Sequence, residues 1–441
     1  MHAQVPQPRR IPYLSGMDWF VHALDCRTRR ATGTGNDSQV ALALAGVVEP
    51  ERLRARLEAF VARNPALAGR CRRHWNLAPY WSFGRAARPR DLRLAVRHLD
   101  DNLSTESVLA ALGEAVSRPL RGPLRIAFTL ARHRDRTYVA MQFDHRLLDA
   151  GGAEALLLHL SQGDPTPAPL ALAPAHLNRW REKFMSGQTV NRELIALRGE
   201  RPPAALPLPA RVRGQPRPTR FVFRLYTPAE TAAIHAQAER RAGYLRLLPF
   251  LLGATIGALH KLCMRQGVAG GDYAVPVTVD SRQRNGARPS LFFNQVSFNF
   301  YRFPAALADD ATALCAEASR QMYAQVQKSV AQHVAQAGML MRILPAPWLG
   351  RLMTWPLWGG LGSLSFSFLG QSGYRSETFL KAPVENVLHT PRVPAPPGIG
   401  VFFTQYRDRM TLVCSYLDGM LDPAAAARFV REIDAELKGA H

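Results

Sequence analysis

The stretch Phe143-Asp144-His145-Arg146-Leu147-Leu148-Asp149-Ala150-Gly151-Gly152 places a titratable base where an apolar segment meets a glycine-rich turn. Residues 137–143 before it are aromatic and β-branched and predict a strand, and residues 153–160 after it predict a buried helix. His145 therefore lies at a strand end, where a loop can present its side chain to a cleft. Because imidazole exchanges protons near neutral pH, His145 is a candidate general base.

A purely structural interpretation of these residues stays open. A histidine at a strand end is often only hydrogen-bonded, and Asp149 could simply cap the helix that follows it. No metal site is predicted, because the neighbouring His133 and His159 lack ligand spacing. The sequence also lacks the G-x-S-x-G elbow that is typical of serine acyl-enzymes.

The composition describes a globular chain that can bury a large core. Its 441 residues are 47% hydrophobic and 20% charged, which is enough for two domains. The 56 basic and 34 acidic residues give a net charge of +22, which favours anionic partners such as anionic lipid, phosphorylated cofactors or acidic carrier proteins. Nucleic acid is disfavoured, because the arginines are scattered and form no long basic run.

The cysteines and the apolar segments indicate in which cellular compartment the protein is expected. The five cysteines are widely spaced and form no C-x-x-C pair, which predicts neither a disulfide framework nor a zinc site. The N-terminus has no apolar core of a secretory signal, and the apolar run 247–259 is shorter than the ~20 residues that a spanning helix needs. We expect a cytoplasmic protein, with peripheral contact to an anionic inner membrane surface as an open option.

The order of expected elements divides the chain into two α/β halves. Residues 1–164 hold strands, helices and the histidine segment, and residues 220–441 hold a second series that ends in a hairpin and a helix started by Pro423. Residues 165–219 contain ten of the 33 prolines around one expected helix near 176–184, which predicts a crossover linker.

The histidine segment resembles a known signature. His145-x-x-x-Asp149-Ala150 is similar to the His-His-x-x-x-Asp-Gly motif of the acyltransferase superfamily that contains chloramphenicol acetyltransferase, peptide-synthetase condensation domains and wax ester synthases. A Leu-Ser-x-x-Asp element at residues 14–18 and two strand-like segments, 275–282 and 294–301, resemble the wax ester synthases in the same order. Asp144 stands in place of the first histidine, Ala150 in place of the glycine, and Phe293 where a later glycine is usual.

The resemblance implies a fold and an activity. The fold would consist of two chloramphenicol acetyltransferase-like subdomains, each a mixed sheet flanked by helices, with an active-site tunnel at their interface. The activity would be acyl transfer from acyl-CoA or a phosphopantetheinyl carrier protein to a hydroxyl or amine, in lipid or specialised-metabolite biosynthesis. No permanently bound cofactor is implied.

The resemblance also implies roles for individual residues. His145 would be the base, and Asp149 would face away from the substrate and pair with an arginine of the second half, for which Arg282 is the candidate; a plain surface role for Arg282 stays open. Such a pair would be bidentate. The predicted contacts to substrate are Asn294, Gln295, Ser297, Asn299, Asp144 and Ser367.

Two further questions stay open at this stage. Asp144 beside the base could favour the imidazolium form and weaken it, or it could point away; a catalytically inactive protein that binds a carrier protein or an apolar ligand is therefore the alternative. The segment 339–362, rich in Trp, Pro and Gly, predicts buried packing, an apolar tunnel lining, or a membrane-surface element.

Overall fold

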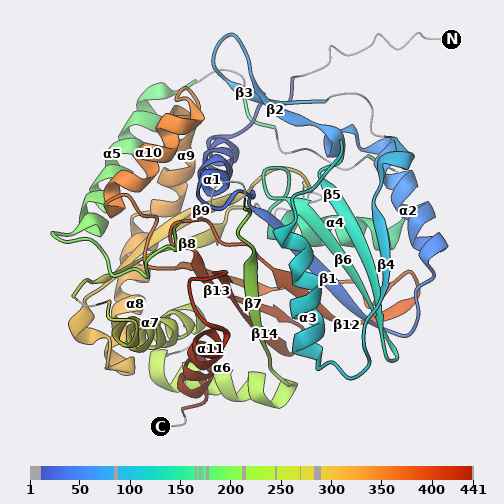
Figure 1. The fold of residues 1–441 in the computed structure, drawn as a ribbon. Coiled ribbons are helices and arrows are strands. Elements are labelled where there is room, and N and C mark those ends of the chain that lie inside the picture. The colour runs from blue at the N-terminus through green and yellow to red at the C-terminus, as the bar shows by residue number, and fades with distance from the viewer. Residues whose placement is uncertain are drawn as a thin grey trace.

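Two six-stranded sheets organise the chain in the computed structural model (Figure 1). The structure describes residues 11–83, 88–163, 166–167, 170, 172–174, 178–210, 215–243, 246–268, 270–282 and 290–439. The predicted pair of mixed sheets, each flanked by helices, is confirmed. Part of the predicted linker, including residues 175–177 at the start of its expected helix, lies outside the described residues.

The first sheet carries the histidine segment, and its strand order is β11-β12-β1-β6-β5-β4. The strands are β1 (Asp37–Ala45), β4 (Leu94–His98), β5 (Ile126–His133), β6 (Arg136–Asp144), β11 (Thr378–Phe379) and β12 (Ala382–Thr390). α2 (Pro50–Arg63) and α4 (Ala150–Gln162) share an apolar core with one face of this sheet, and α3 (Thr105–Gly113) packs on the other face. β5 and β6 form the hairpin that the sequence predicts, and β6 ends at Asp144.

The second sheet has the order β7-β14-β13-β10-β8-β9. Its strands are β7 (Thr219–Leu225), β8 (Tyr273–Asp280), β9 (Val296–Phe303), β10 (Ser365–Gln371), β13 (Ile399–Tyr406) and β14 (Arg409–Leu417). Four helices share its core: α6 (Pro228–Ala242), α7 (Leu247–Arg265), α8 (Ala311–Gln327) and α11 (Pro423–Lys438). Among the described residues α7 alone is long and apolar enough to cross a membrane, but 72% of its apolar window is buried, so it packs here as a core helix.

Pro276 in the strand-like segment 275–282 predicts an edge strand or a bulge, because proline cannot donate a backbone hydrogen bond. The edge position is wrong. β8 lies second from the edge, between β10 and β9, and β9 is the edge strand. The pairing of β8 with β10 is recorded at Val277 with Phe366, one residue beyond the proline. On its other side β8 pairs in register with β9 through Pro276, which lies opposite Phe300.

β12 joins the two halves, although it comes from the C-terminal range. It pairs antiparallel with β1 from Gln39–Thr390 to Leu44–Val384. The sequence analysis assigned no element between residues 370 and 401, so it missed this strand. His389 on β12 contacts Glu154 of α4 at 2.7 Å, and both side chains are buried. The first sheet is therefore complete only when the second half is in place.

The remaining helices form a layer beside the second sheet. They are α1 (Gly16–Thr32), α5 (Trp180–Arg198), α9 (Val330–Met341) and α10 (Ala346–Thr354), followed by the short η5 (Trp355–Leu357). α1 contacts α9 and α10, and α5 contacts α9 and η5. The smaller elements are η1 (Pro65–Ala68), η2 (Pro89–Asp91), η3 (Glu114–Ser117), η4 (Ala305–Leu307) and the β2–β3 ladder (Arg70–Arg73 with Pro79–Ser82).

Two glycines let the second half approach the first turn of α4. A Cβ at Gly151 would lie 2.7 Å from Nη1 of Arg282, and a Cβ at Gly152 would lie 2.3 Å from the carbonyl oxygen of Leu291. The second contact is with backbone, which cannot move aside cheaply. Gly152 is therefore required by the close approach of residues 291–295.

We predict that Gly152→Ala destabilises the protein by roughly 1–3 kcal/mol, because overpacking forces a backbone shift. Gly187→Ala is the matched control, since Gly187 is also helical and a Cβ there meets nothing within 4 Å. That variant should be neutral or more stable, because alanine is the better helix former. Thermal unfolding of both variants is the measurement, and equal shifts would contradict the packing argument.

Candidate active site

His145 lies in the turn that connects β6 with α4. The turn is closed by Leu147 and Leu148, whose N–H groups donate to the carbonyl of Asp144 (2.9 and 3.2 Å). The imidazole is half-buried, 6.3 Å from the ring of Phe143. Its Nδ1 has no hydrogen-bond partner among the described residues.

Residues 293–295 of the second half run along this turn and hydrogen-bond to it three times. The N–H of Phe293 donates to the carbonyl of Leu147 (2.7 Å). Nδ2 of Asn294 donates to the carbonyl of His145 (3.1 Å), and the N–H of Gln295 donates to Oδ2 of Asp149 (2.8 Å). The turn that carries the candidate base is thus shaped by both halves.

Phe293 occupies a position where the backbone favours glycine. Its φ is +74°, in the left-handed region that L-residues rarely adopt. Its ring is buried and packs edge-on against Trp81, with 5.9 Å between centroids. Packing of the ring therefore offsets the backbone strain that a glycine would avoid.

Asp149 is both a helix cap and an ionic partner. Its Oδ1 accepts from the N–H of Gly152 (2.8 Å), which caps α4, and also from Nη2 of Arg282. The expected bidentate pair is not formed, because Nη1 of Arg282 contacts Asp280 instead (3.1 Å). Burial opposes the charge of Arg282, but Asp149 outweighs it and raises the pKa of the guanidinium.

Asp144 is occupied by the arginine two residues later. Nε of Arg146 donates to its Oδ1 (2.8 Å), and Nη2 contacts its Oδ2 (2.5 Å). The carboxylate is 3% exposed; burial opposes its ionisation, but the charge of Arg146 holds its pKa below the ordinary value. Asp144 precedes the candidate base in the sequence, but Arg146 neutralises its charge and holds it in a structural role.

The sequence analysis missed a buried ionic cluster around Arg146. Asp25 on α1 lies 3.6 Å from Nη1 of Arg146 and 2.7 Å from Nε of Arg29. Asp37 pairs in register with Asp144 across β1 and β6. Burial, and next to it the charge of Asp144, raise the pKa of Asp37 to about 6. Only the i,i+4 spacing of Asp25 and Arg29 gave a sequence signal for this cluster.

α1 contributes two further residues that the sequence analysis did not assign to the site. Asp18 forms a capping box with Ser15 and accepts from the N–H of Asn294 (2.7 Å), which ties α1 to the turn. His22 stacks on Trp19 with 4.9 Å between centroids. Burial, then the charge of Arg146, lower the pKa of His22 to about 4, so this imidazole is neutral at pH 7.

Most of the other predicted substrate contacts bind within the protein. Ser297 donates to the carbonyl of Ala331 (2.5 Å), Ser367 shares a hydrogen bond with Thr278 (2.7 Å), and the amide of Gln295 donates to Ser290. Oδ1 of Asn294 and Oδ1 of Asn299 have no partner among the described residues. Both oxygens are buried, so each is an acceptor without a donor among the described residues.

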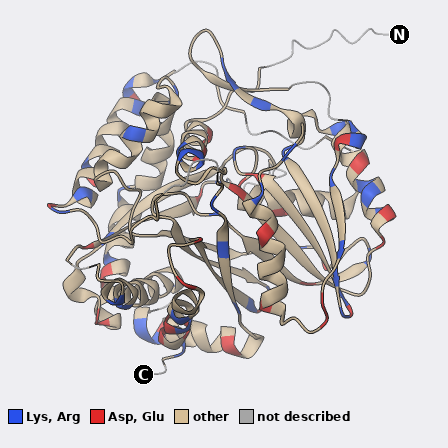
Figure 2. Ribbon diagram, viewed as in Figure 1, with Lys and Arg blue, Asp and Glu red and all other residues tan. Residues whose placement is uncertain are grey.

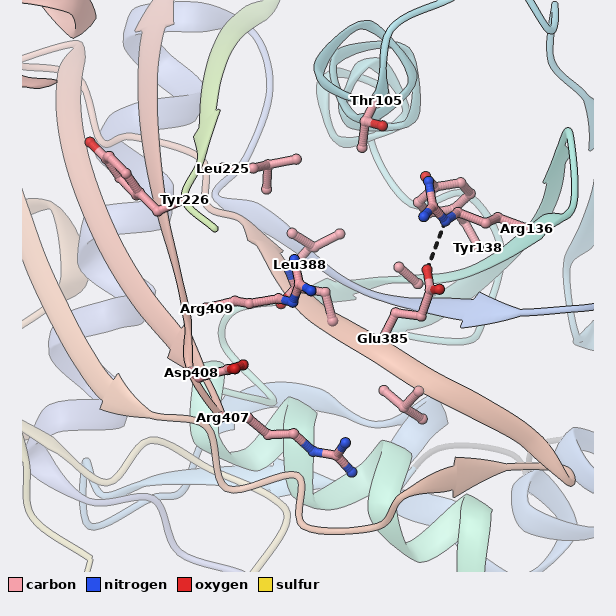
Figure 3. A pocket seen from close by; sticks show the side chains of 13 residues that line it. Thr105, Arg136, Tyr138, Leu225, Tyr226, Glu385, Leu388, Arg407, Asp408 and Arg409 are labelled. Carbon is pink, nitrogen blue, oxygen red and sulfur yellow. Dashed lines mark hydrogen bonds and ion pairs between the residues drawn. The ribbon is translucent and has the colours of Figure 1, made fainter. Parts of the chain in front are cut away.

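Two cavities of similar size lie elsewhere in the molecule, and neither has His145 in its lining. A cavity of about 470 Å³ lies between the halves at the far end of β6 and includes Arg136, Tyr138, Arg407 and Arg409 (Figure 3). A cavity of about 460 Å³ lies between α1 and α10. Among the described residues no group of three His, Cys, Asp or Glu could hold a metal ion. The tunnel implied by the resemblance stays a prediction.

We predict that Arg282→Ala destabilises the protein by about 3–5 kcal/mol, because it leaves the buried carboxylate of Asp149 without its ionic partner. The two side chains are only 13% and 2% exposed. Arg220→Ala, which breaks the exposed pair with Asp418, should cost less than about 1 kcal/mol. Chemical denaturation compares the two; a small effect at both sites would contradict the structural role of the pair.

We also predict that Asp37→Asn stabilises the protein above pH 7, on the order of 2 kcal/mol. The raised pKa of Asp37 means that its contribution to stability is full below about pH 4 and is lost as the pH rises through about 6. Asparagine cannot ionise, so the difference between variant and parent should grow from pH 4 to pH 8. Denaturation at several pH values tests this; a constant difference would contradict it.

Comparison with known proteins gives structural relatives only. No protein-family model matches the sequence, and no curated protein matches it. The solved structures do match. The trichothecene 15-O-acetyltransferase TRI3 from Fusarium sporotrichioides has a TM-score of 0.67 at 15% identity, over 97% of this chain and 94% of that chain.

Two further solved structures come from peptide synthetases. The starter condensation domain of rhizomide synthetase, in complex with C8-CoA and Leu-SNAC, has a TM-score of 0.64 at 13% identity and covers 97% of this chain and 94% of that chain. The third module's epimerization domain of tyrocidine synthetase B has a TM-score of 0.59 at 13% identity, over 99% and 98%.

The fold is therefore the one shared by CoA-dependent acyltransferases and condensation domains, as the histidine motif predicted. At these identities the likeness establishes the fold alone. An epimerization domain has the same fold, so the reaction has to be argued from the residues at the turn.

Proposed function

We propose that the protein is an acyltransferase that moves an acyl group from a CoA or carrier-protein thioester to a hydroxyl or amine, with His145 as the general base. The observation that supports this most directly is the state of the imidazole. The His145 side chain is half-exposed, its Nδ1 is buried without a protein partner among the described residues, and its turn is clamped by hydrogen bonds from the second half. The turn fixes the position of this base, while no hydrogen bond within the protein occupies its Nδ1.

In the proposed reaction the imidazole takes the proton of the acceptor hydroxyl or amine as its oxygen or nitrogen attacks the thioester carbonyl. The tetrahedral intermediate then collapses, the C–S bond breaks, and the leaving thiolate receives the proton from the imidazolium. Asp149 and Arg282 act by positioning the turn. Asn294 and Asn299 are the proposed polar contacts to substrate, because their Oδ1 atoms are buried acceptors without a partner among the described residues.

Charge and the structural relatives support the choice of donor. The net charge of +22 favours an anionic acyl-CoA or an acidic carrier protein. The rhizomide condensation domain was crystallised with C8-CoA, and TRI3 is an acetyltransferase acting on a trichothecene. We therefore propose a role in lipid or specialised-metabolite biosynthesis, in the cytoplasm.

The alternative is an inactive protein that binds a carrier protein or an apolar ligand. Its motivation is the replacement of two motif residues by Asp144 and Ala150. Asp144 is neutralised by Arg146, and Ala150 opens α4 directly ahead of the two glycines that the close approach requires. The pairing of Asp144 with Arg146 accounts for the first replacement, and Ala150 is compatible with the start of α4; neither replacement removes the base, which favours the active protein.

A thiol-release assay with a panel of acyl thioesters and alcohol or amine acceptors tests the proposal. We expect His145→Ala to lower the rate by roughly 10²–10⁴-fold, the usual contribution of a general base. His98→Ala is the control, since His98 is exposed on β4 away from the turn. Turnover that survives His145→Ala would refute the base assignment, and tight carrier binding without turnover would favour the inactive alternative.

A further inference from the structure

One side of α10 and η5 exposes large apolar side chains. Trp348, Leu352 and Trp355 are 65%, 48% and 53% exposed, and Trp358, directly after η5, is 45% exposed. Residues 348, 351, 352 and 355 follow the i, i+3, i+4, i+7 spacing of one helical face. We call the set Trp348, Arg351, Leu352, Trp355 and Trp358 the tryptophan face.

The rings of this face are held in place from α5. The guanidinium of Arg198 stacks 4.1 Å from the ring centroid of Trp358 and 4.8 Å from that of Trp355. Its Nη1 donates to the carbonyl of Trp355 (2.6 Å), and the indole N–H of Trp358 donates to the carbonyl of Arg198 (3.2 Å). Arg198 therefore holds Trp355 and Trp358, and Ile195 on α5, 54% exposed and one turn before Arg198, adds a further exposed apolar side chain beside them.

The two elements that carry the tryptophan face hold one charged residue, Arg351, and residues 318–376 contain no Asp or Glu. α5 beside them carries Glu182 and Glu193, and Glu193 pairs with Lys328 (2.8 Å). Figure 2 shows Lys and Arg in blue and Asp and Glu in red on the ribbon; α9 and η5 contain neither kind of residue, and α10 contains only the basic Arg351. The nearest acidic residue in sequence is Glu377, on the far side of β10.

A basic cavity adjoins the same face. The cavity of about 460 Å³ between α1 and α10 has an apolar floor that includes Leu208, Ala346 and Pro347. Arg27, Arg30 and Arg351 line it, and Arg351 also belongs to the tryptophan face. Arg351 is therefore the residue that the cavity and the tryptophan face share.

We propose that the tryptophan face docks on an anionic phospholipid bilayer, with its indole rings at the interface and lipid phosphates against the arginines of the adjoining cavity. Tryptophan is enriched at the membrane–water interface, and each basic side chain near an anionic surface strengthens binding. A bilayer fits better than an acidic protein, because the exposed side chains are bulky and apolar on an outward helix face. This interaction is independent of the proposed acyl transfer.

Vesicle co-sedimentation of the full chain tests the proposal, with phosphatidylcholine vesicles against vesicles that also contain phosphatidylglycerol. We expect binding to the anionic vesicles, and a loss of roughly tenfold in partitioning for Trp348→Ser with Trp355→Ser, since two apolar rings leave the interface. Arg351→Glu should weaken binding by a similar factor and leave binding less sensitive to salt. An emission shift of the tryptophans on binding gives a second readout.

Matched controls come from exposed residues elsewhere. Trp75→Ser removes a ring that is 86% exposed in the β2–β3 turn, and Arg431→Glu reverses an exposed charge on α11. Neither should change partitioning by more than about twofold, and thermal unfolding should show every variant folded.

Equal binding by parent and tryptophan-face variants, or no binding to anionic vesicles, would overturn the proposal. A second result would also overturn it. If the tryptophan-face variants lose thioester turnover with an acidic acyl carrier protein when no vesicles are present, the face binds a carrier protein instead. Thioester turnover in solution is measured separately, so a failure of the proposed chemistry is distinguishable from a failure of membrane docking.

Discussion

The carboxylate of Asp149 is the interaction on which the two halves depend. It receives the N–H of Gly152 from its own helix, the N–H of Gln295 and the guanidinium of Arg282 from the other half. A buried carboxylate with three donors is stable only when all of them are present. The formation of the turn around His145 is therefore coupled to the docking of Arg282 and of residues 290–295.

The same coupling recurs at two other places. Asp18 links α1 to Asn294, and the buried pair of Glu154 with His389 links α4 to β12. Each of these contacts joins segments that lie far apart in sequence. The candidate base is thus located by contacts from α1, from the turn itself and from the second half, which explains why a fold of this kind can hold one histidine accurately without a catalytic triad.

The electrostatics of the site separate structural carboxylates from the candidate base. Arg146 neutralises Asp144 and also faces Asp25, while Asp37 remains the carboxylate that burial disfavours. Among the described residues, His145 is the titratable group of this turn that forms no ion pair. Asp144 in place of the first motif histidine is therefore compatible with the proposed chemistry, because Arg146 neutralises the charge of Asp144.

The sequence alone determined the elements that depend on local pattern. Aromatic and β-branched composition and glycine placement predicted β6, the turn and α4. The resemblance to the acyltransferase motif implied the fold and offered Arg282 as the partner of Asp149, with a surface role left open; the structure shows the contact. Pro423 after Asp422 likewise located the start of α11.

The tertiary structure decided what depends on long-range pairing. β12 was invisible in the sequence because a strand is defined by its partner, and its partner β1 lies more than 300 residues earlier. The Arg146 cluster, the positive φ of Phe293 and the outward orientation of Trp348 and Trp355 follow from how the helices and sheets pack. Periodicity can show that a side chain shares a face with its neighbours, but only packing shows whether that face meets the core, the other half or the solvent.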